Sequence, residues 1–123
     1  MISVTKRFRF EAAHNLPEYP GDCAKIHGHS YVLDITFEAP YDHDYQPPIK
    51  GMVIDFKDIK EHVGPIVDKL DHTMLNDIFP IPTAERMVKW LVNEIQQTPV
   101  GTGLIRVRLW ETADSYATWS IYG

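Results

Sequence analysis

The stretch that decides the fold is residues 27–39, His27-Gly28-His29-Ser30-Tyr31-Val32-Leu33-Asp34-Ile35-Thr36-Phe37-Glu38-Ala39 (HGHSYVLDITFEA). Its odd positions carry imidazole, aromatic and aliphatic side chains, whereas its even positions are mostly polar or small. Successive side chains of a β-strand point to opposite faces of the sheet, so this alternation predicts a strand with one buried face and one wetter face. Both histidines lie on the face predicted to be buried.

Residues 2–14 (ISVTKRFRFEAAH) repeat the pattern, with mostly apolar even positions and polar odd ones. His14 lies on the same face as Phe8 and Phe10, at the far end of this predicted strand. If the two strands form an antiparallel pair, the end of the first lies near the start of the second, and residues 15–26 form a long hairpin connection. His14, His27 and His29 would then meet at one edge of the core.

Two helices are predicted next. Asp55 and Thr83 are their expected N-caps, and each is followed by apolar residues at helical spacing. The stripes are Phe56, Ile59, Val63, Ile66, Val67 and Leu70 in the first helix, and Met87, Val88, Leu91, Val92 and Ile95 in the second. Gly64-Pro65 is expected to weaken or bend the first helix. The chain then returns to strands at 104–112 (LIRVRLWET) and 116–122 (YATWSIY). The order β-β-α-α-β-β predicts an α+β fold, an antiparallel sheet with two helices on one face.

Three inward imidazoles are the ligand set of a catalytic zinc site, which keeps a fourth position open. Each histidine taken singly is more often a packed side chain whose ring is satisfied by backbone carbonyls. The agreement in phase of His14 with the His27-Gly28-His29 pair favours a metal site, with zinc ahead of other metals.

Cys23 precedes His27 by four residues, and this spacing leaves three interpretations open. It could be a fourth zinc ligand in a closed structural site. It could be a reactive thiolate beside an open metal site, since a nearby cation lowers a thiol pKa. It could also be a buried, inert cysteine.

Asp71-His72 follows the first helix and could act as an acid–base pair, or as a helix end whose histidine meets the dipole. Glu111 ends the apolar row of the strand at 104–112 and needs partners, because a buried bare carboxylate is unfavourable. A ligand with two parallel N–H groups would suit it, as would a salt bridge to Arg106 or Lys89. Lys25 is either a surface lysine or a contact for an anionic tail. His43 and His62 are expected to be solvated.

Size and composition narrow the class of protein. The chain has 123 residues, is 44% hydrophobic, and has a net charge of −5, which fits one domain spanning 1–123 and no basic nucleic-acid arm. No apolar run is long enough to span a membrane, and the start does not look like a secretory signal. A lone cysteine fits the reducing cytoplasm. Residues 39–51 (APYDHDYQPPIKG) form the clearest predicted loop.

Several motifs together resemble the 6-pyruvoyl-tetrahydropterin synthase family, and most closely its 6-carboxytetrahydropterin synthase branch of queuosine biosynthesis. They are FEAAHNLP, CAKIHGHSY, GMVIDF, LDHTMLND, PTAE and ET, in family order over residues 10–112. The resemblance implies the tunnelling fold, whose subunits typically associate through sheet edges into homo-oligomeric rings, often hexamers, with active sites at subunit interfaces. The C-x-x-x-H-G-H spacing resembles the bacterial carboxy-forming branch, whereas the 40–50 loop and the C-terminal tail match no motif.

The resemblance also implies roles for single residues. His14, His27 and His29 match the zinc ligands, Cys23 the catalytic cysteine, and Asp71 with His72 the acid–base pair. Glu111 matches the carboxylate that anchors the pterin ring, and Thr83 and Glu85 fall where the family adds pterin contacts. We expect Lys25 to assist the elimination of triphosphate as a local cation.

The implied reaction converts 7,8-dihydroneopterin triphosphate to 6-carboxytetrahydropterin, acetaldehyde and triphosphate, in a pathway to queuosine or other deazapurines. The rival activities are the pyruvoyl-forming synthase, which differs in the bond that breaks, a non-catalytic zinc-stabilised module, and a pterin-binding scaffold. No nucleic acid or membrane is expected as a partner.

Overall fold

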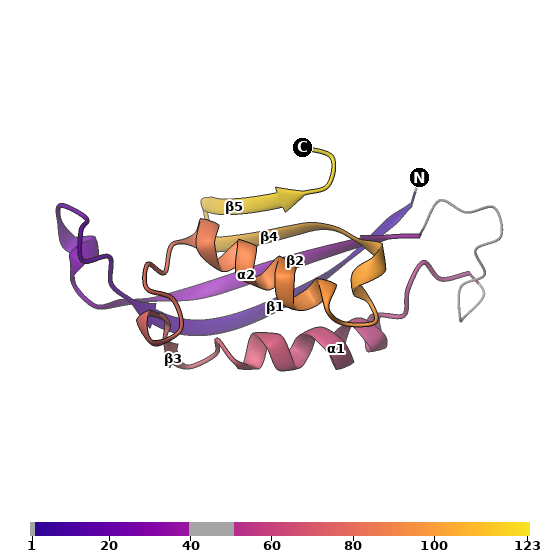
Figure 1. Cartoon of the computed structure of the whole chain (residues 1–123), viewed down its shortest axis with the longest axis horizontal. Coiled ribbons are helices and arrows are strands. Elements are labelled where there is room, and N and C mark those ends of the chain that lie inside the picture. Colours follow the sequence, from indigo (N-terminus) through magenta and orange to yellow (C-terminus); the bar gives the residue numbers. More distant parts are fainter. Residues whose placement is uncertain (1, 40–50) are drawn as a thin grey trace.

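The computed structural model describes residues 2–39 and 51–123. A five-stranded sheet has the order β3-β1-β2-β4-β5, and all neighbours are antiparallel except β1 and β3. The strands are β1 (Ser3–His14), β2 (His27–Glu38), β3 (Thr73–Met74), β4 (Leu104–Thr112) and β5 (Ser115–Ser120). The helices α1 (Phe56–Asp68) and α2 (Ala84–Gln96) lie on the same side of the sheet (Figure 1). The predicted α+β architecture is therefore confirmed.

The predicted strand phases are confirmed by burial. On β2, Tyr31, Leu33, Ile35 and Phe37 are almost fully buried, and they face the helices together with Phe10 of β1. The rings of Phe10 and Tyr31 stack with centroids 4.8 Å apart. This row leads directly to the histidines, so the same alternation that builds the core also turns three imidazoles inward.

Both predicted helix caps are present. Asp55 accepts a hydrogen bond from the Lys57 N–H, and Thr83 accepts one from the Arg86 N–H. Phe56 was predicted to belong to the apolar stripe of α1, but it is 51% exposed at the first helical position. Pro65 does not end α1, which continues to Asp68.

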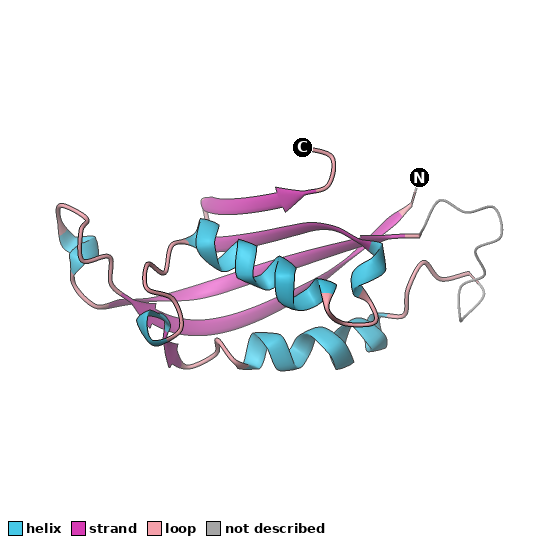
Figure 2. Cartoon of the chain, in the orientation of Figure 1, coloured by secondary structure: helices cyan, strands magenta, loops and turns pink. Residues whose placement is uncertain are grey.

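The strand β3 was not predicted. It has two residues and pairs in parallel with Ala12 and Ala13 of β1 (Figure 2). A strand of two residues is too short to show a periodic pattern in the sequence, which is why it was missed. It is followed directly by the 3-10 turn η2 (Leu75–Asp77). Two further such turns are η1 (Asp22–Ala24), in the segment that projects beyond the end of β1, and η3 (Gly101–Gly103). The predicted loop at 39–51 lies almost wholly outside the described residues, as does His43.

Candidate functional site

The three predicted metal-ligating histidines converge where β1 ends and β2 begins. The antiparallel register pairs His14 with His27 and Ala12 with His29, which brings all three rings to one corner of the buried face. The Nε2 atom of His14 lies 3.1 Å from the Nε2 atoms of both His27 and His29. The three ligand atoms all lie within 4.8 Å of one another, so this cluster could hold a metal ion.

The opposite ring nitrogens of two of these histidines are held by backbone carbonyls. His14 Nδ1 donates to the carbonyl of Pro82 at 3.0 Å, and His27 Nδ1 donates to the carbonyl of Lys25 at 2.7 Å. Because a carbonyl only accepts, these contacts place the ring proton on Nδ1 and leave the Nε2 lone pairs facing each other in the cluster. Facing lone pairs repel one another unless a cation lies between them, so the donor set fits a metal ion.

Burial favours the neutral form of His29 at the cluster. His14 is fully buried, and burial lowers the pKa of His29, an effect that the nearby Glu111 carboxylate partly opposes. The Oε1 atom of Glu111 lies 3.6 Å from His29 Nε2. A neutral ring is the form that binds a metal, and the carboxylate provides an acceptor at the edge of the site. The salt bridge from Glu111 to Arg106 or Lys89, the alternative left open by the sequence, is not among the described contacts.

Two residues at the cluster were missed by sequence reasoning. One is Pro82, whose carbonyl orients His14. The other is Tyr31, whose hydroxyl lies 3.4 Å from His14 Nδ1 and whose pKa is raised, chiefly by burial. Tyr31 shares the phase of His27 and His29, so the strand pattern contained a signal for it. The contact of Pro82 with His14 joins residues far apart in the chain and has no local signal.

Cys23 lies in η1, half-buried and without a disulfide. The described group of possible metal ligands contains the three histidines and does not include Cys23. The turn around Cys23 is held to the end of β1, since the Leu16 N–H donates to the Cys23 carbonyl at 2.8 Å. The thiol is thus carried by the same hairpin connection that links two of the metal-ligand candidates.

Asp71 and His72 form the predicted pair, but at the outer edge of β1. His72 Nδ1 lies 2.9 Å from Asp71 Oδ1, and the same oxygen accepts the Glu11 N–H at 2.9 Å. The Glu11 N–H, with a smaller contribution from His72, holds the pKa of Asp71 below its usual range. His72 has a φ of 57°, donates its own N–H to the Glu11 carbonyl, and is 79% exposed in its side chain. No described hydrogen bond or ion pair joins this pair to Cys23 or to the three histidines, but His72 and His29 line the same open pocket beside β1.

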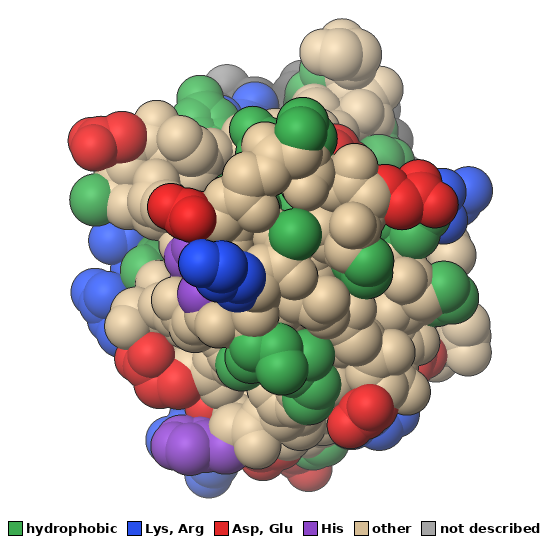
Figure 3. All heavy atoms as spheres, turned by 90° about the vertical axis from the view of Figure 1, so that its left-hand side faces the viewer, with side chains coloured by type: hydrophobic (Ala, Val, Ile, Leu, Met, Phe, Trp, Pro, Cys, Tyr) green, Lys and Arg blue, Asp and Glu red, His purple; other side chains and the backbone are tan. Residues whose placement is uncertain are grey.

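The side chains of the remaining predicted site residues make no described contact with the cluster, although the Lys25 carbonyl binds His27 and Thr83 directly follows Pro82. Lys25 is 83% exposed in its side chain and 4.0 Å from Asp22. The Thr83 hydroxyl is engaged as the cap of α2, and Glu85 lines a groove between α2 and β5. Figure 3 looks onto this end of the molecule and shows histidine side chains at separate places on the surface, some of them beside a basic side chain.

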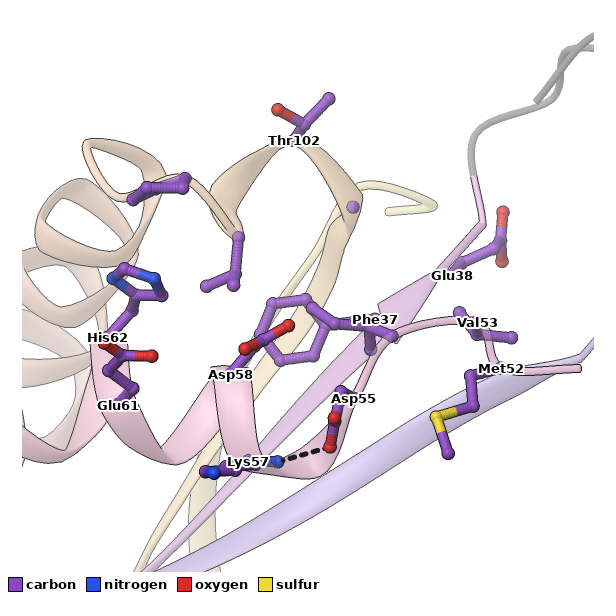
Figure 4. Close-up of a pocket in the computed structure, with 14 residues that line it drawn as sticks. Phe37, Glu38, Met52, Val53, Asp55, Lys57, Asp58, Glu61, His62 and Thr102 are labelled. Carbon is purple, nitrogen blue, oxygen red and sulfur yellow. Dashed lines mark hydrogen bonds between the residues drawn. The ribbon is translucent and has the colours of Figure 1, made fainter. Parts of the chain in front are cut away.

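A separate cavity of about 680 Å³ lies at the opposite end of the sheet (Figure 4). Asp58, Glu61 and His62 line it from α1, opposite Phe37 of β2. His62, predicted to be solvated, is half-buried here. Within 2–39 and 51–123, however, only the histidine triplet forms a group of three possible metal ligands, so the triplet marks the candidate site.

The family model for 6-pyruvoyl tetrahydropterin synthase matches residues 3–121. The chain belongs to this family. Membership confirms the family resemblance of the motifs. A metal ion at the histidine triplet is consistent with this family, and the family implies a small pterin molecule as substrate.

Three relatives illustrate the range of the family. The 6-carboxy-5,6,7,8-tetrahydropterin synthase of Synechocystis sp. is 36% identical and covers 97% of this chain and 93% of its own length. The dihydroneopterin monophosphate aldolase of Pyrococcus furiosus is 33% identical over 88% of each chain. The solved 6-pyruvoyl tetrahydropterin synthase of Caenorhabditis elegans has a TM-score of 0.83 at 23% identity, over 97% of this chain and 94% of that one, and confirms the fold.

No helix within the described residues combines the length and the apolar character needed to cross a membrane.

Proposed function

We propose that the protein is a zinc-dependent 6-carboxytetrahydropterin synthase. The observation that carries the proposal is the convergence of three histidine ring nitrogens within 4.8 Å, in a family member that is 36% identical to a carboxy-forming synthase over 97% of the chain. The substrate would be 7,8-dihydroneopterin triphosphate, and the products 6-carboxytetrahydropterin, acetaldehyde and triphosphate.

His14, His27 and His29 would hold the zinc. The bound ion would supply Lewis acidity toward the hydroxyl groups of the substrate side chain. The carbonyls of Pro82 and Lys25 keep two of the rings in the tautomer that this task requires.

Glu111 would anchor the pterin. Its Oε1 atom is 3.6 Å from His29 Nε2, so a ring bound to Glu111 through its paired N–H groups would lie beside the three histidines. Holding the ring there would orient the reacting carbons and lower the entropic part of the barrier.

Cys23 would move protons at the side-chain carbons, with Asp71 and His72 as the second acid–base element. Asp71 supports His72 from 2.9 Å, and the lowered pKa of Asp71 keeps this carboxylate charged and able to stabilise an imidazolium. The outer-edge location of the pair, with its largely exposed imidazole, fits a site completed where subunits meet.

We further propose that Lys25 contacts the triphosphate, and that Thr83 and Glu85 add contacts to the pterin. Lys25 is exposed, its one described ion pair is with the exposed Asp22 carboxylate at 4.0 Å, and it would supply a local positive charge in a chain whose net charge is −5. The remaining proposals are a single domain, a cytoplasmic location, a homo-oligomer, expected to be hexameric, and a role in queuosine or deazapurine biosynthesis.

The test is a product assay by mass spectrometry, on a sample whose zinc content is also measured. With 7,8-dihydroneopterin triphosphate we expect 6-carboxytetrahydropterin and acetaldehyde in equal amounts. Turnover without acetaldehyde would contradict the carboxy-forming reaction and favour the pyruvoyl-forming one.

A second candidate function is aldol cleavage of dihydroneopterin monophosphate, which the Pyrococcus furiosus relative favours at 33% identity. The same assay separates the two when the monophosphate is offered beside the triphosphate. Preferential cleavage of the monophosphate to 6-hydroxymethyl-7,8-dihydropterin and glycolaldehyde phosphate would replace the first proposal.

A further inference from the structure

The side-chain amide of Asn76 replaces a missing strand residue at the end of β1. Its Oδ1 accepts the Asn15 N–H at 2.9 Å, and its Nδ2 donates to the Asn15 carbonyl at 3.0 Å. The parallel ladder with β3 reaches only Ala13, because the chain turns into η2 after Met74. Asn76 thus continues by side chain the hydrogen bonding that the backbone of β3 has ended.

Asn15 and the residue after it are in turn hydrogen-bonded to η1, the turn that contains Cys23. Its Nδ2 donates to the Ala24 carbonyl at 3.3 Å, and the next residue, Leu16, donates its N–H to the Cys23 carbonyl at 2.8 Å. The carbonyls of Cys23 and Ala24 in η1 are therefore both hydrogen-bonded to the segment that directly follows His14.

These contacts form one chain of hydrogen bonds from η2 to η1. Asn76, Asn15 and Cys23 are all half-buried, so the bonds between them are partly shielded from competing water. No other described hydrogen bond ties η1 to the end of β1; the Lys25 carbonyl at the end of the turn binds His27 on β2, and the remaining bonds of the turn are internal to residues 16–25.

We propose that Asn76 is a positioning residue that, through Asn15, holds Cys23 in place relative to the three histidines. This inference rests on the proposed function for the role of the thiol. The hydrogen bonds from Asn76 through Asn15 to the turn, called the clamp below, are a property of the folded chain itself. The inference predicts an effect on the thiol and on turnover without an effect on pterin binding or metal content.

Alanine variants separate the two links of the clamp. Asn76→Ala removes both bonds to the Asn15 backbone, whereas Asn15→Ala removes only the bond to Ala24, because Asn76 binds the backbone of residue 15. Asn76→Asp keeps the acceptor for the Asn15 N–H and loses the donor. The matched control is Asn93→Ala, on the exposed face of α2.

We expect kcat to fall about 100-fold in Asn76→Ala and about tenfold in Asn15→Ala, since a displacement of about 1 Å can cost two orders of magnitude in rate. KM should stay within about twofold, Asn76→Asp should lie between wild type and Asn76→Ala, and the double variant should lose less than the product of the single losses. Zinc content should equal that of wild type.

A second readout needs no substrate. The rate of Cys23 alkylation by iodoacetamide, taken at the plateau of its pH profile where the thiol is fully ionised, reports access to the sulfur. Releasing the half-buried turn should raise this plateau at least about threefold in Asn76→Ala and leave it unchanged in Asn93→Ala.

The outcomes are distinguishable. A folded Asn76→Ala variant with wild-type kcat and wild-type alkylation would overturn the inference, as would loss of zinc in parallel with turnover, which marks a general structural role. If Asn76→Ala fails to fold, Asn76→Asp and Asn15→Ala decide by the same criteria. If wild type itself does not turn over the pterin triphosphate, the proposed function fails, and the alkylation rates alone decide the role of Asn76.

Discussion

Cys23 and His14 lie on the same hairpin but in different surroundings, and this difference bears on the separate roles proposed for them. His14 is fully buried with its Nε2 in the cluster, whereas Cys23 is half-buried in η1 and outside the group of possible ligands. Among the interpretations that its spacing left open, a fourth metal ligand fits this arrangement least well.

Replacing each of these two residues by alanine should therefore have different effects on zinc content and similar effects on turnover. Cys23→Ala should retain zinc and lower kcat by at least about 100-fold, the usual contribution of a proton-transferring group. His14→Ala should lose both zinc and turnover, because two ligands remain. Metal analysis and the product assay on the same samples measure both quantities.

The control is His62→Ala, an imidazole on α1 at the opposite end of the sheet, which should change neither quantity. Loss of zinc and of the fold in Cys23→Ala would mean that the protein is a zinc-stabilised module with cysteine as a ligand.

On the face of the sheet turned away from the helices, Arg7 and Asp34 form a bidentate pair. Arg7 Nε and Nη2 donate to the two oxygens of Asp34 at 2.7 and 2.8 Å, and Trp110 Nε1 adds a donor at 3.3 Å. The hydrogen bond from Arg7 is the main reason that the pKa of Asp34 lies below its ordinary value of 3.8. The folded state therefore favours the charged carboxylate.

A group of this kind stabilises the fold above its ordinary pKa, and the contribution is lost as the pH falls through the lowered pKa. Asp34→Asn should reduce the free energy of unfolding by about 1 kcal/mol at pH 7, as for a well-ordered surface pair. Urea titrations of wild type and variant should show this difference shrinking below about pH 4. Asp114→Asn, in the exposed turn after β4, is the control, and a difference that does not change with pH would contradict the assignment.

At the scale of elements, α1 contains a proline that its helix tolerates. Pro65 lies in the last turns of α1, exposed, where it lacks the N–H that would donate to the Glu61 carbonyl. Replacing Pro65 by Ala should raise the free energy of unfolding by about 1–2 kcal/mol, the helix gain less the entropy lost from a stiffer unfolded chain.

Pro99 offers a comparison of opposite sign. It is also exposed but lies in the turn between α2 and η3, so Pro99→Ala should lower the free energy of unfolding by about 0.5 kcal/mol through the unfolded chain alone. Denaturant titrations of both variants measure these changes. Equal changes in the free energy of unfolding would show that the helix places no constraint on Pro65.

The elements also show which parts of the molecule the sequence could predict. Period-two alternation located β1 and β2 and turned His14, His27 and His29 to the same face, because burial of one sheet face imposes that pattern. The strand β3, the register shift after Thr36 and the Asn76–Asn15 bonds have no such pattern. They depend on contacts between segments far apart in the chain, as does the contact of Pro82 with His14.

At the scale of the whole molecule, the sheet has two edges, and they differ in what they offer a second copy. The edge strand β3 has two residues, whereas β5 has six. Ile121 donates its N–H to the Ile105 carbonyl of the neighbouring chain segment. Because N–H groups alternate in direction along an antiparallel strand, those of Tyr116, Thr118 and Ser120 point away from β4.

Such a row of outward N–H groups can pair with another strand, so we expect the homo-oligomer to form in part through β5. Thr118→Pro removes one outward donor and no ladder bond to β4, and proline is tolerated at a sheet edge. Light scattering after gel filtration should show a smaller assembly for Thr118→Pro than for wild type. Thr118→Ala is the matched control, because it also loses the hydroxyl that accepts from Arg108 but keeps the N–H.

Activity should follow the assembly. No described hydrogen bond or ion pair joins the Asp71–His72 pair at the β1 edge to Cys23 or to the histidine triplet, so we expect the site to be completed by a neighbouring chain of the assembly. We expect Thr118→Pro to lose turnover while its zinc content stays at the wild-type value, since all three histidines belong to one chain. A Thr118→Pro protein that keeps the wild-type mass and turnover would exclude β5 from the interface, and one that is dissociated yet fully active would show that a single chain holds the whole site.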